Sequence, residues 1–333
     1  MATRPKKKKS GATRRGNFPL GRDVAPIDAT AIRTYPLASR KSKFTRADFG
    51  TVHRAGASVG DFLRGLPKVL GADDLRAITK AVVDARLGGR PVIVGMGAHV
   101  IKTGLSPILI DLLERGVITA LAMNGACLVH DAELAMVGHT SEDVDATLAG
   151  GGFGGAQETA ETLNAAVAAG SASRGLGRAV GEYLVKQKFP FVRESLLATC
   201  ARLGIPCTIH VAVGTDIFHM HPAADGAALG ASSMRDFRTF CSLVRGMNGG
   251  VYLNFGSAVI LPEIFLKAVS LSRNLGANLD DVTTANFDFI KGYRPLTNVV
   301  KRPTGGSGRG YNLVGHHEIM IPLFAAAIVE GIA

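Results

Sequence analysis

The apolar positions between residues 91 and 145 predict a strand, a helix and a second strand in succession. A short apolar run, Val92 to Val94, ends at glycines, and a helical pattern follows with apolar residues on one face and charged residues off it. Gly116 ends that pattern, and a second apolar run, Val117 to Met123, leads into Asn124-Gly125-Ala126. This order is typical of a right-handed βαβ unit in a parallel sheet. Because ligands of such sheets bind at the carboxyl ends of the strands, we place the functional site at the two turns that follow these strands.

The same alternation of apolar strands and amphipathic helices continues along the chain. Apolar strands are predicted at 207–213, 251–255 and from 282, and each ends in small or polar residues. Helical patterns lie at 158–169, 191–203, 234–245 and 264–275, and an earlier one at 75–87 has Asp73 or Asp74 as its expected N-terminal cap. This repeated order predicts an α/β protein with a doubly wound parallel sheet.

Charge and composition divide the chain into three segments. Residues 1–16 contain seven Lys or Arg and no acidic residue, so the net charge of +11 leaves only +4 for the remainder. We interpret 1–16 as a disordered basic tail, which binds nucleic acid at most weakly through phosphate charge. Residues 17–70 are an irregular arm that ends in a short helix near Val59 to Leu66, and 71–333 are a single α/β domain.

The bulk composition favours a cytoplasmic enzyme. A chain of 333 residues that is 47% hydrophobic can bury a large core. No apolar run approaches the roughly 20 residues of a membrane span, and no signal peptide is visible. The four cysteines show no metal-ligand spacing, so we expect reduced thiols in the core and no metal site.

Polar residues directly after the second strand are candidates for chemistry. His130, Asp131 and Glu133 follow the Asn124-Gly125-Ala126 turn, where a carboxylate binds ribose hydroxyls or accepts a proton. The alternative is that Asp131 caps a helix while Glu133 is solvated. Further on, the glycine run 150–155 is either a nest for phosphate or a mobile loop.

Histidines and a lysine later in the chain add further candidates. His219 and His221 follow Asp216 at the end of the 207–213 strand, and imidazole transfers protons near neutral pH. Lys301 lies in a basic, glycine-rich segment. A lysine with a depressed pKa forms imines, and the alternative is that the basic loop binds an anion. His317 is in the His316-His317-Glu318 segment, before an apolar C-terminal run. In each case the alternative is that the side chain has no role in chemistry and is either held by structural hydrogen bonds or solvated.

With these strand ends assembled, residues 85–330 resemble the deoxyhypusine synthases, a family with a Rossmann-like NAD-binding fold. The resemblance rests on Ala98 to Gly104, on Asp216 with His221, on Gly256-Ser257-Ala258, and on Thr284-Ala285 with Asp288. A shorter resemblance, to the NAD domain of LOR/SDH-type ornithine cyclodeaminases, rests on Asn124-Gly125-Ala126, Val129 to Glu133, Gly138, Thr140-Ser141 and Val144-Asp145.

Both resemblances imply NAD as cofactor, a homo-oligomer, and a diamine, polyamine or basic amino acid as substrate. The substrate amine would be oxidised transiently to an imine, which is then transferred, cyclised or hydrolysed. The implied cofactor-binding residues are Gly97, Ala98, His99, Thr103, Asn124, Gly125, Ala126, Asp131, Gly256, Ser257, Thr284, Ala285 and Asp288. The expected catalytic residues are Lys301, His219, His221 and Glu133, and the substrate-binding residues are Asp216, His130 and His317.

Two departures from the deoxyhypusine synthase pattern define the alternative function. Leu261-Pro262-Glu263 stands where that family has a catalytic histidine, and Pro303 stands where it has the imine-forming lysine, with Lys301 as the nearest lysine. These departures favour the alternative of a non-catalytic NAD-binding protein with the same fold.

Overall fold

The computed structural model describes residues 25–170 and 173–333, and the chain divides into two units, Met1–Thr45 and Arg46–Ala333. In the first unit, every residue of 25–45 is exposed, and a 3-10 turn, η1 (Leu37–Ser39), is formed. The basic tail expected at 1–16 lies outside the described residues. The second unit contains the helices and the sheet, and includes a short 3-10 turn, η2 (Arg46–Asp48), at its start.

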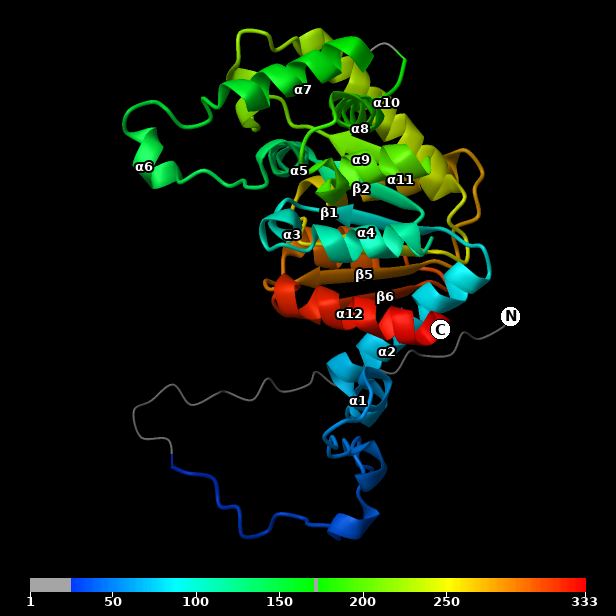
Figure 1. The fold of residues 1–333 in the computed structure, drawn as a ribbon. Helices are drawn as coiled ribbons and strands as arrows, with labels where there is room; N and C mark the ends of the chain where they lie inside the picture. Colours follow the sequence, from blue (N-terminus) through cyan, green and yellow to red (C-terminus); the bar gives the residue numbers. More distant parts are fainter. Residues whose placement is uncertain (1–24, 171–172) are drawn as a thin grey trace, which may run out of the picture. The chain divides into compact units, whose positions relative to one another are not determined.

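The second unit is built on a parallel sheet of six strands (Figure 1). The strands are β1 (Val92–Met96), β2 (Ala120–Asn124), β3 (Cys207–His210), β4 (Val251–Phe255), β5 (Thr283–Asp288) and β6 (Arg309–Val314). Their order across the sheet is β3-β2-β1-β4-β5-β6, and every pairing is parallel. The predicted doubly wound sheet is therefore confirmed. The direction of winding reverses between β1 and β4, which makes their carboxyl ends the topological switch point.

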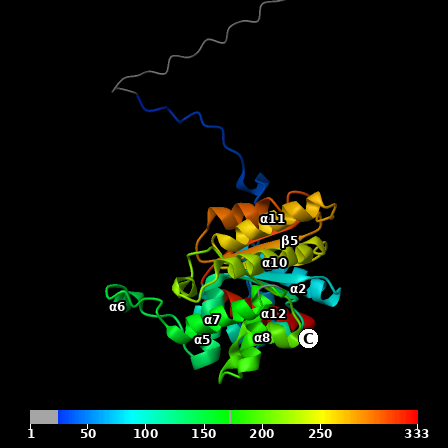
Figure 2. The same cartoon turned by 90° about the horizontal axis from the view of Figure 1, so that it is seen from above.

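Alternate residues of β1, β2 and β4 enter two separate hydrophobic cores. In β1, Val92, Val94 and Met96 face the larger core, whereas Ile93 faces the smaller one. The larger core is completed by α2 (Leu70–Leu87), α4 (Ser106–Glu114), α5 (Gly125–Val137), α7 (Gln157–Gly170), α8 (Leu176–Gln187), α9 (Leu196–Leu203) and α12 (His317–Ile332). The smaller core is completed by α10 (Gly226–Arg245) and α11 (Ile260–Asn274), which lie next to each other in Figure 2. Burial on both faces explains why β1 and β2 are nearly continuous apolar runs.

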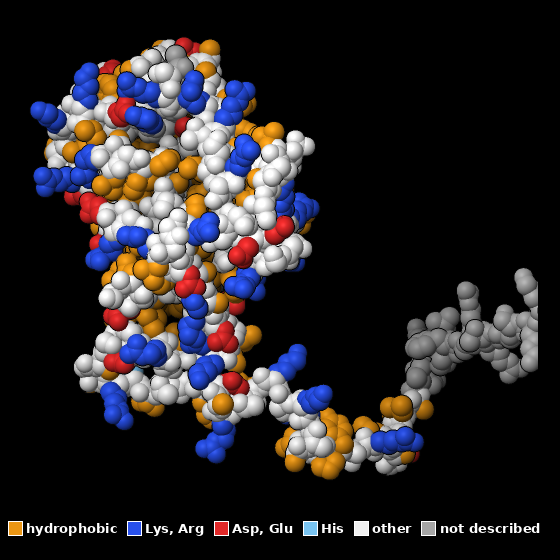
Figure 3. Space-filling view, turned by 90° about the vertical axis from the view of Figure 1, so that its right-hand side faces the viewer, with side chains coloured by type: hydrophobic (Ala, Val, Ile, Leu, Met, Phe, Trp, Pro, Cys, Tyr) orange, Lys and Arg blue, Asp and Glu red, His pale blue; other side chains and the backbone are white. Residues whose placement is uncertain are grey.

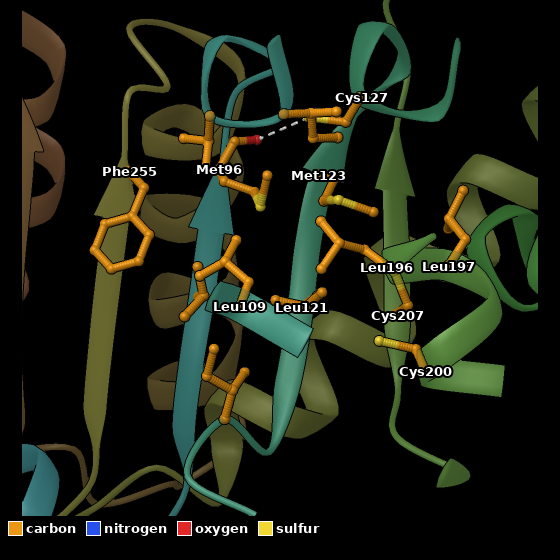
Figure 4. Packing of buried hydrophobic residues seen from close by; sticks show 14 of the residues in the cluster. Met96, Leu109, Leu121, Met123, Cys127, Leu196, Leu197, Cys200, Cys207 and Phe255 are labelled. Carbon is orange, nitrogen blue, oxygen red and sulfur yellow. Dashed lines mark hydrogen bonds between the residues drawn. The ribbon is translucent and has the colours of Figure 1, made fainter. Parts of the chain in front are cut away.

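Figure 4 shows how the larger core joins the strands to α4 and α9. Side chains of Met96, Leu121 and Met123 from the sheet meet Leu109 of α4 and Leu196 of α9. The cysteines at 127, 200 and 207 are buried in this same packing, and all four cysteines of the chain are unbridged.

Several helix ends differ from the sequence-based expectation. Helix α2 begins at Leu70 and has Val69 as its N-cap without a side-chain bond, so neither Asp73 nor Asp74 is the cap. The helix expected at 191–203 is divided into a 3-10 turn, η3 (Val192–Glu194), and α9, because the Ser195 side chain caps α9 by accepting from Ala198 N. Residues 17–70 include α1 (Val59–Gly65), close to where a short helix was expected.

Two further differences concern the C-terminal third of the chain. Strand β6 was not predicted, because only Leu313 of its six residues is a buried apolar residue. The apolar run 319–329 lies in α12 and buries Ile321, Phe324 and Ile328 in the larger core. Most of the large apolar side chains of this run are thus packed within the second unit.

No described helix is long and apolar enough to cross a membrane. On the face seen in Figure 3, Lys and Arg side chains are dispersed with Asp and Glu among them. This dispersal agrees with the small net charge of the chain beyond residue 16.

Candidate functional site

The turns after β1 and β4 approach each other closely at the switch point. Gly97 N donates to the carbonyl oxygen of Phe255 at 3.0 Å, and a Cβ added to Gly97 would lie 2.6 Å from the carbonyl oxygen of Gly256. Gly256 has φ of +63° and no room for a side chain, because an added Cβ would lie 2.5 Å from Cε1 of His317. Both positions therefore require glycine, because the two turns and the His317 ring pack directly against their backbone.

Aromatic rings from three elements gather beside these glycines. His99 begins α3 (His99–Lys102), Phe289 follows β5, and His316 and His317 precede and begin α12. The His99 ring lies 5.3 Å from that of His317 and 5.5 Å from that of Phe289, and Phe289 stacks on His316 at 6.0 Å. Phe289 is 42% exposed, so this cluster presents an accessible flat ring at the edge of the sheet.

His317 is the buried member of the ring cluster. Its Nε2 lies 3.1 Å from the carbonyl oxygen of Phe287, which requires an N–H at that position. Its Nδ1 is then an acceptor, and that atom is buried without a partner. Burial lowers the pKa of His317 more than the Phe287 carbonyl raises it, which keeps the ring neutral.

The Asp216 carboxylate lies over the start of α5, close to the carboxyl ends of β2 and β3. The Asn124 side chain caps α5 by accepting from Cys127 N at 3.0 Å, and Gly125 is the first helical residue. A Cβ added to Gly125 would overlap the Asp216 carboxylate, so the carboxylate lies directly over this glycine. Burial raises the pKa of Asp216 to about 6, and its Oδ2 receives a long bond of 3.5 Å from the Thr215 hydroxyl.

His219 shapes the loop that carries Asp216. It lies in a 3-10 turn, η4 (Ile217–Met220), and its Nδ1 accepts from Gly214 N at 3.2 Å and Asp216 N at 3.3 Å. Its Nε2 must therefore carry the proton, and this atom is buried without a partner. Burial lowers the pKa of His219. His221 is half-buried and accepts locally from Ala223 N at 3.2 Å.

His130 and Glu133 form a hydrogen-bonded chain farther along α5. His130 Nδ1 lies 2.7 Å from the Thr140 hydroxyl, which donates to Glu133, and Thr159 Oγ1 donates to the other Glu133 oxygen at 3.1 Å. The Thr140 hydroxyl gives its proton to Glu133, so it accepts from an N–H at His130 Nδ1. Burial lowers the pKa of His130, and the chain joins α5 to the 138–156 segment and α7.

Asp131 does not reach the carboxyl edge of the sheet. It is fully buried, and its carboxylate accepts from Ser195 Oγ at 2.5 Å, Leu196 N at 2.7 Å and Leu197 N at 3.1 Å. These bonds hold the first turn of α9, although burial raises the Asp131 pKa to about 6. The expected ribose contact is thus replaced by a capping role for a different helix.

Three other expected residues lie away from this edge. Thr284 and Ala285 are buried near the beginning of β5, and Thr284 Oγ1 donates to the carbonyl oxygen of Val299 at 2.7 Å. Lys301 is exposed at the end of a π-helical segment, η5 (Pro295–Lys301), just past Val299. Four residues of strand separate Thr284 from the carboxyl end at Asp288, which is about 13 Å. Lys301 therefore does not join His219, His221 or Glu133.

The remaining expected residues have local partners at the edge. Ser257 is buried and its hydroxyl accepts from Leu261 N at 3.1 Å, which holds the start of α11. Thr103 Oγ1 donates to the carbonyl oxygen of His99 at 2.9 Å. Asp288 is the last residue of β5 and accepts from Ile290 N at 3.4 Å, while Ala98 and Ala126 are half-buried in the turns after β1 and β2.

The glycine run 150–155 follows α6 (Val144–Leu148) on a segment that extends from the left side in Figure 1. Gly154 N donates to Glu142 Oε2 at 2.9 Å. A carboxylate of the same segment therefore takes one of the backbone N–H groups that an anion nest would use. Among residues 25–170 and 173–333, no three His, Cys, Asp or Glu side chains gather to hold a metal ion.

The edge therefore combines two close glycine turns, a ring cluster and a buried carboxylate at a helix start. Sequence reasoning identified the turns and Asp216 but missed Phe289. No pattern signals this residue, because a single aromatic after a strand is equally common in a core.

No family model matches the sequence, and no curated protein matches it. Solved structures do share its fold. A LOR/SDH protein from Methanococcus maripaludis S2 superposes with a TM-score of 0.52 at 18% identity over 79% of this chain and 71% of that one. AgrE in its ternary complex with ornithine and NAD+ has a TM-score of 0.52 at 18% identity over 77% of this chain and 32% of AgrE. A protein named as a deoxyhypusine synthase of Entamoeba histolytica has a TM-score of 0.50 at 12% identity over 84% of this chain and 96% of that one.

These likenesses confirm the expected resemblance at the level of the fold. The chain spans about a third of the length of AgrE. Identities of 18% or less carry the fold alone, so the activity has to be argued from the residues at the carboxyl edge.

Proposed function

We propose that this chain is an NAD-dependent enzyme that oxidises a small diamine, polyamine or basic amino acid transiently at an amine-bearing carbon. The observation that carries the proposal is the Asp216 carboxylate, buried over Gly125 at the switch-point edge with few partners of its own. A substrate ammonium would bind this carboxylate through a charge-assisted bond. Neighbours of the same fold include AgrE, which was crystallised with ornithine and NAD+.

The glycine turns fit a dinucleotide at this edge. Gly97 and Gly256 bring the turns after β1 and β4 together at the switch point, which is where sheets of this kind bind the pyrophosphate of a dinucleotide. When bound, NAD would accept a hydride from the amine-bearing carbon. The residues that would hold it are Gly97, Ala98, His99, Asn124, Gly125, Ala126 and Gly256.

The chain's own groups would position the substrate and move its proton. Asp216 would hold the substrate ammonium as its counter-charge through a charge-assisted bond, and the proton that leaves the reacting nitrogen would go to another acceptor. His219 presents an Nε2–H as a donor, because its Nδ1 is held by Gly214 N and Asp216 N. His317 presents the opposite group, an unpartnered Nδ1 acceptor. His219 is thus better suited to donate a hydrogen bond than to act as a general base.

The cofactor assignment is tested by thermal denaturation with NAD. We expect NAD to raise the melting temperature, since a ligand present at about 100 times its Kd stabilises the native state by about 2.7 kcal/mol. Asn124→Leu should remove the shift, because the bulky side chain would cover the turn before Gly125. The exposed substitution Asp145→Asn is the matched control and should keep it. An unchanged melting curve at millimolar NAD would refute the cofactor.

The reaction is tested with substrates deuterated on the amine-bearing carbon. Putrescine, spermidine, ornithine and arginine-type amines are incubated with the NAD-loaded protein, and we expect deuterium in NADH or in the product. This readout covers imine transfer, cyclisation and hydrolysis alike. If NAD binds but none of these amines delivers deuterium, the chain is a non-catalytic NAD-binding protein.

A further inference from the structure

A second cavity opens between α10 and α11, on the face of the sheet that carries the smaller core. It has a volume of about 470 Å³, and its walls are mainly apolar side chains of Met234, Phe237, Val259, Ile260 and Ile264. His210, the last residue of β3, also lines it. This cavity plays no part in the proposed oxidation of an amine.

His210 carries the unusual chemistry of this cavity. The residue is only 2% exposed, and its ring packs edge-on against Phe240 with centroids 5.5 Å apart. Its Nε2 lies 3.1 Å from the Thr208 hydroxyl, whereas its Nδ1 is buried without a partner. A buried polar atom without a hydrogen bond is unfavourable, and a donor on a ligand or a water molecule would complete this one.

The hydrogen bonds around Thr208 fix the role of that free nitrogen. The Thr208 hydroxyl donates to the carbonyl oxygen of Leu121 at 3.4 Å, so it accepts from an N–H at His210 Nε2. His210 Nδ1 is then a lone-pair acceptor. Burial lowers the pKa of His210 to about 3, which keeps the imidazole neutral at physiological pH.

The charges at the cavity cancel each other. Glu263 and Lys267 are its charged lining residues, and they form an ion pair one helical turn apart on α11. Glu263 also accepts from Asn298 Nδ2 at 2.9 Å and lies 3.3 Å from Arg294 Nε. Because its charge is already neutralised, the cavity offers no counter-charge to an ion.

From these contacts we propose that the cavity between α10 and α11 binds a small uncharged ligand that has an apolar body and one O–H or N–H donor directed at His210 Nδ1. The apolar walls take the body of the ligand, and the buried acceptor selects for the donor. The residues assigned above to NAD do not line this cavity, so we infer that the two sites are distinct.

Benzyl alcohol is the probe, compared with benzyl methyl ether, which lacks the donor, and with benzylamine, which is charged. In titrations of the full chain without NAD, followed by ligand-observed NMR, we expect saturable binding of the alcohol. The ether should bind about tenfold more weakly, as expected for one lost hydrogen bond, and benzylamine should also bind more weakly than the alcohol. Equal binding of all three compounds, or no saturable binding, would overturn the proposal.

Two variants locate the binding. Gly230 lies on α10 at the cavity with no atom within 4 Å of an added Cβ, so Gly230→Phe should fill the cavity without a clash and abolish binding. Ala231→Phe, on the exposed neighbouring position of α10, is the control and should bind normally.

His210→Phe tests the acceptor itself. The phenyl ring suits the contact with Phe240, and the variant should bind the alcohol and the ether alike, which a merely structural His210 would not produce. Binding that survives Gly230→Phe, or a preference for the alcohol that survives His210→Phe, would place the probe elsewhere. Displacement of benzyl alcohol by NAD would show that the cavity belongs to the cofactor site and would refute a separate site.

Discussion

At the scale of single residues, Asp216 destabilises the native state at neutral pH. The pKa of its carboxyl is raised from 3.8 to about 6, so the folded state binds the proton more tightly than the unfolded state. The penalty is therefore absent below pH 4, grows as the pH rises, and is complete above about pH 6. A group kept under such a penalty is typical of a functional site.

Asp216→Asn should accordingly increase the free energy of unfolding at pH 8 by about 1–2 kcal/mol, after allowance for partial solvent screening. The gain should vanish at pH 3.5, where the wild-type carboxyl is protonated in both states. Urea denaturation at the two pH values measures this difference. The same variant should weaken the free energy of amine binding by about 1.5–3 kcal/mol, which is the contribution of one charged hydrogen bond. If the difference in free energy of unfolding between Asp216→Asn and the wild type were the same at both pH values, burial would not perturb this carboxyl.

Asp131 has a capping role, which is the alternative interpretation of its position in the sequence, and the helix that it holds is α9. Asp131→Ala would leave the Ser195 hydroxyl and the N–H groups of Leu196 and Leu197 buried without their acceptor. We expect a loss of about 2–4 kcal/mol in the free energy of unfolding, measured by urea denaturation.

The exposed substitution Asp145→Ala is the control for Asp131→Ala and should stay within about 0.5 kcal/mol of the wild type. If Asp131 caps α9, the melting-temperature shift caused by NAD should persist in Asp131→Ala. A lost NAD shift with unchanged stability would instead favour the ribose contact.

At the scale of elements, the β1–α3 and β4–α11 turns depend on their mutual approach. Gly97→Ala places a methyl group 2.6 Å from the carbonyl oxygen of Gly256, so one of the turns must move. We expect a loss of about 1–3 kcal/mol in stability together with loss of the NAD shift. Gly226→Ala, at an open position at the start of α10, is the matched control and should change stability by less than about 1 kcal/mol. An NAD shift that survives Gly97→Ala would move the cofactor away from the switch point.

The position of η5 makes a prediction about the lysine that the resemblance favoured. Lys301 is exposed and lies near the amino end of β5, beyond Val299. Lys301→Ala should therefore leave both the NAD shift and deuterium transfer unchanged. If transfer stopped while NAD still bound, an enzyme-bound imine at Lys301 would have to be part of the reaction.

At the scale of the whole molecule, the two units should differ in their contribution to stability. Every residue of 25–45 is exposed, whereas the cores lie entirely in Arg46–Ala333. A chain that starts at Arg46 should unfold within about 0.5 kcal/mol of the full chain in urea. It should also lose any salt-sensitive binding to single-stranded DNA, since seven basic residues lie in 1–16. A lower stability of the shortened chain would show that the first unit supports the second.

The sequence by itself determined the class of the fold and indicated the edge at which we place the candidate site. Apolar runs of strand length, separated by helical periodicity and ended by small residues, depend on neighbouring positions alone, and this local pattern is sufficient for a doubly wound sheet. It located β1, β2, β3, β4 and β5 and the turns at Gly97, Asn124 and Gly256. It failed for β6, because Leu313 is the one buried apolar side chain that this edge strand contributes.

The tertiary structure decided which polar side chains share the site. Asp131 and Asp216 both lie near polar or small residues in the sequence, yet one faces the start of α9 and the other the start of α5. Lys301 and His317 are close in sequence, but the intervening β6 carries them to opposite ends of the sheet. Strand order, register and the face taken by each helix are set by long-range packing, and periodicity along the chain holds no information about those distant partners.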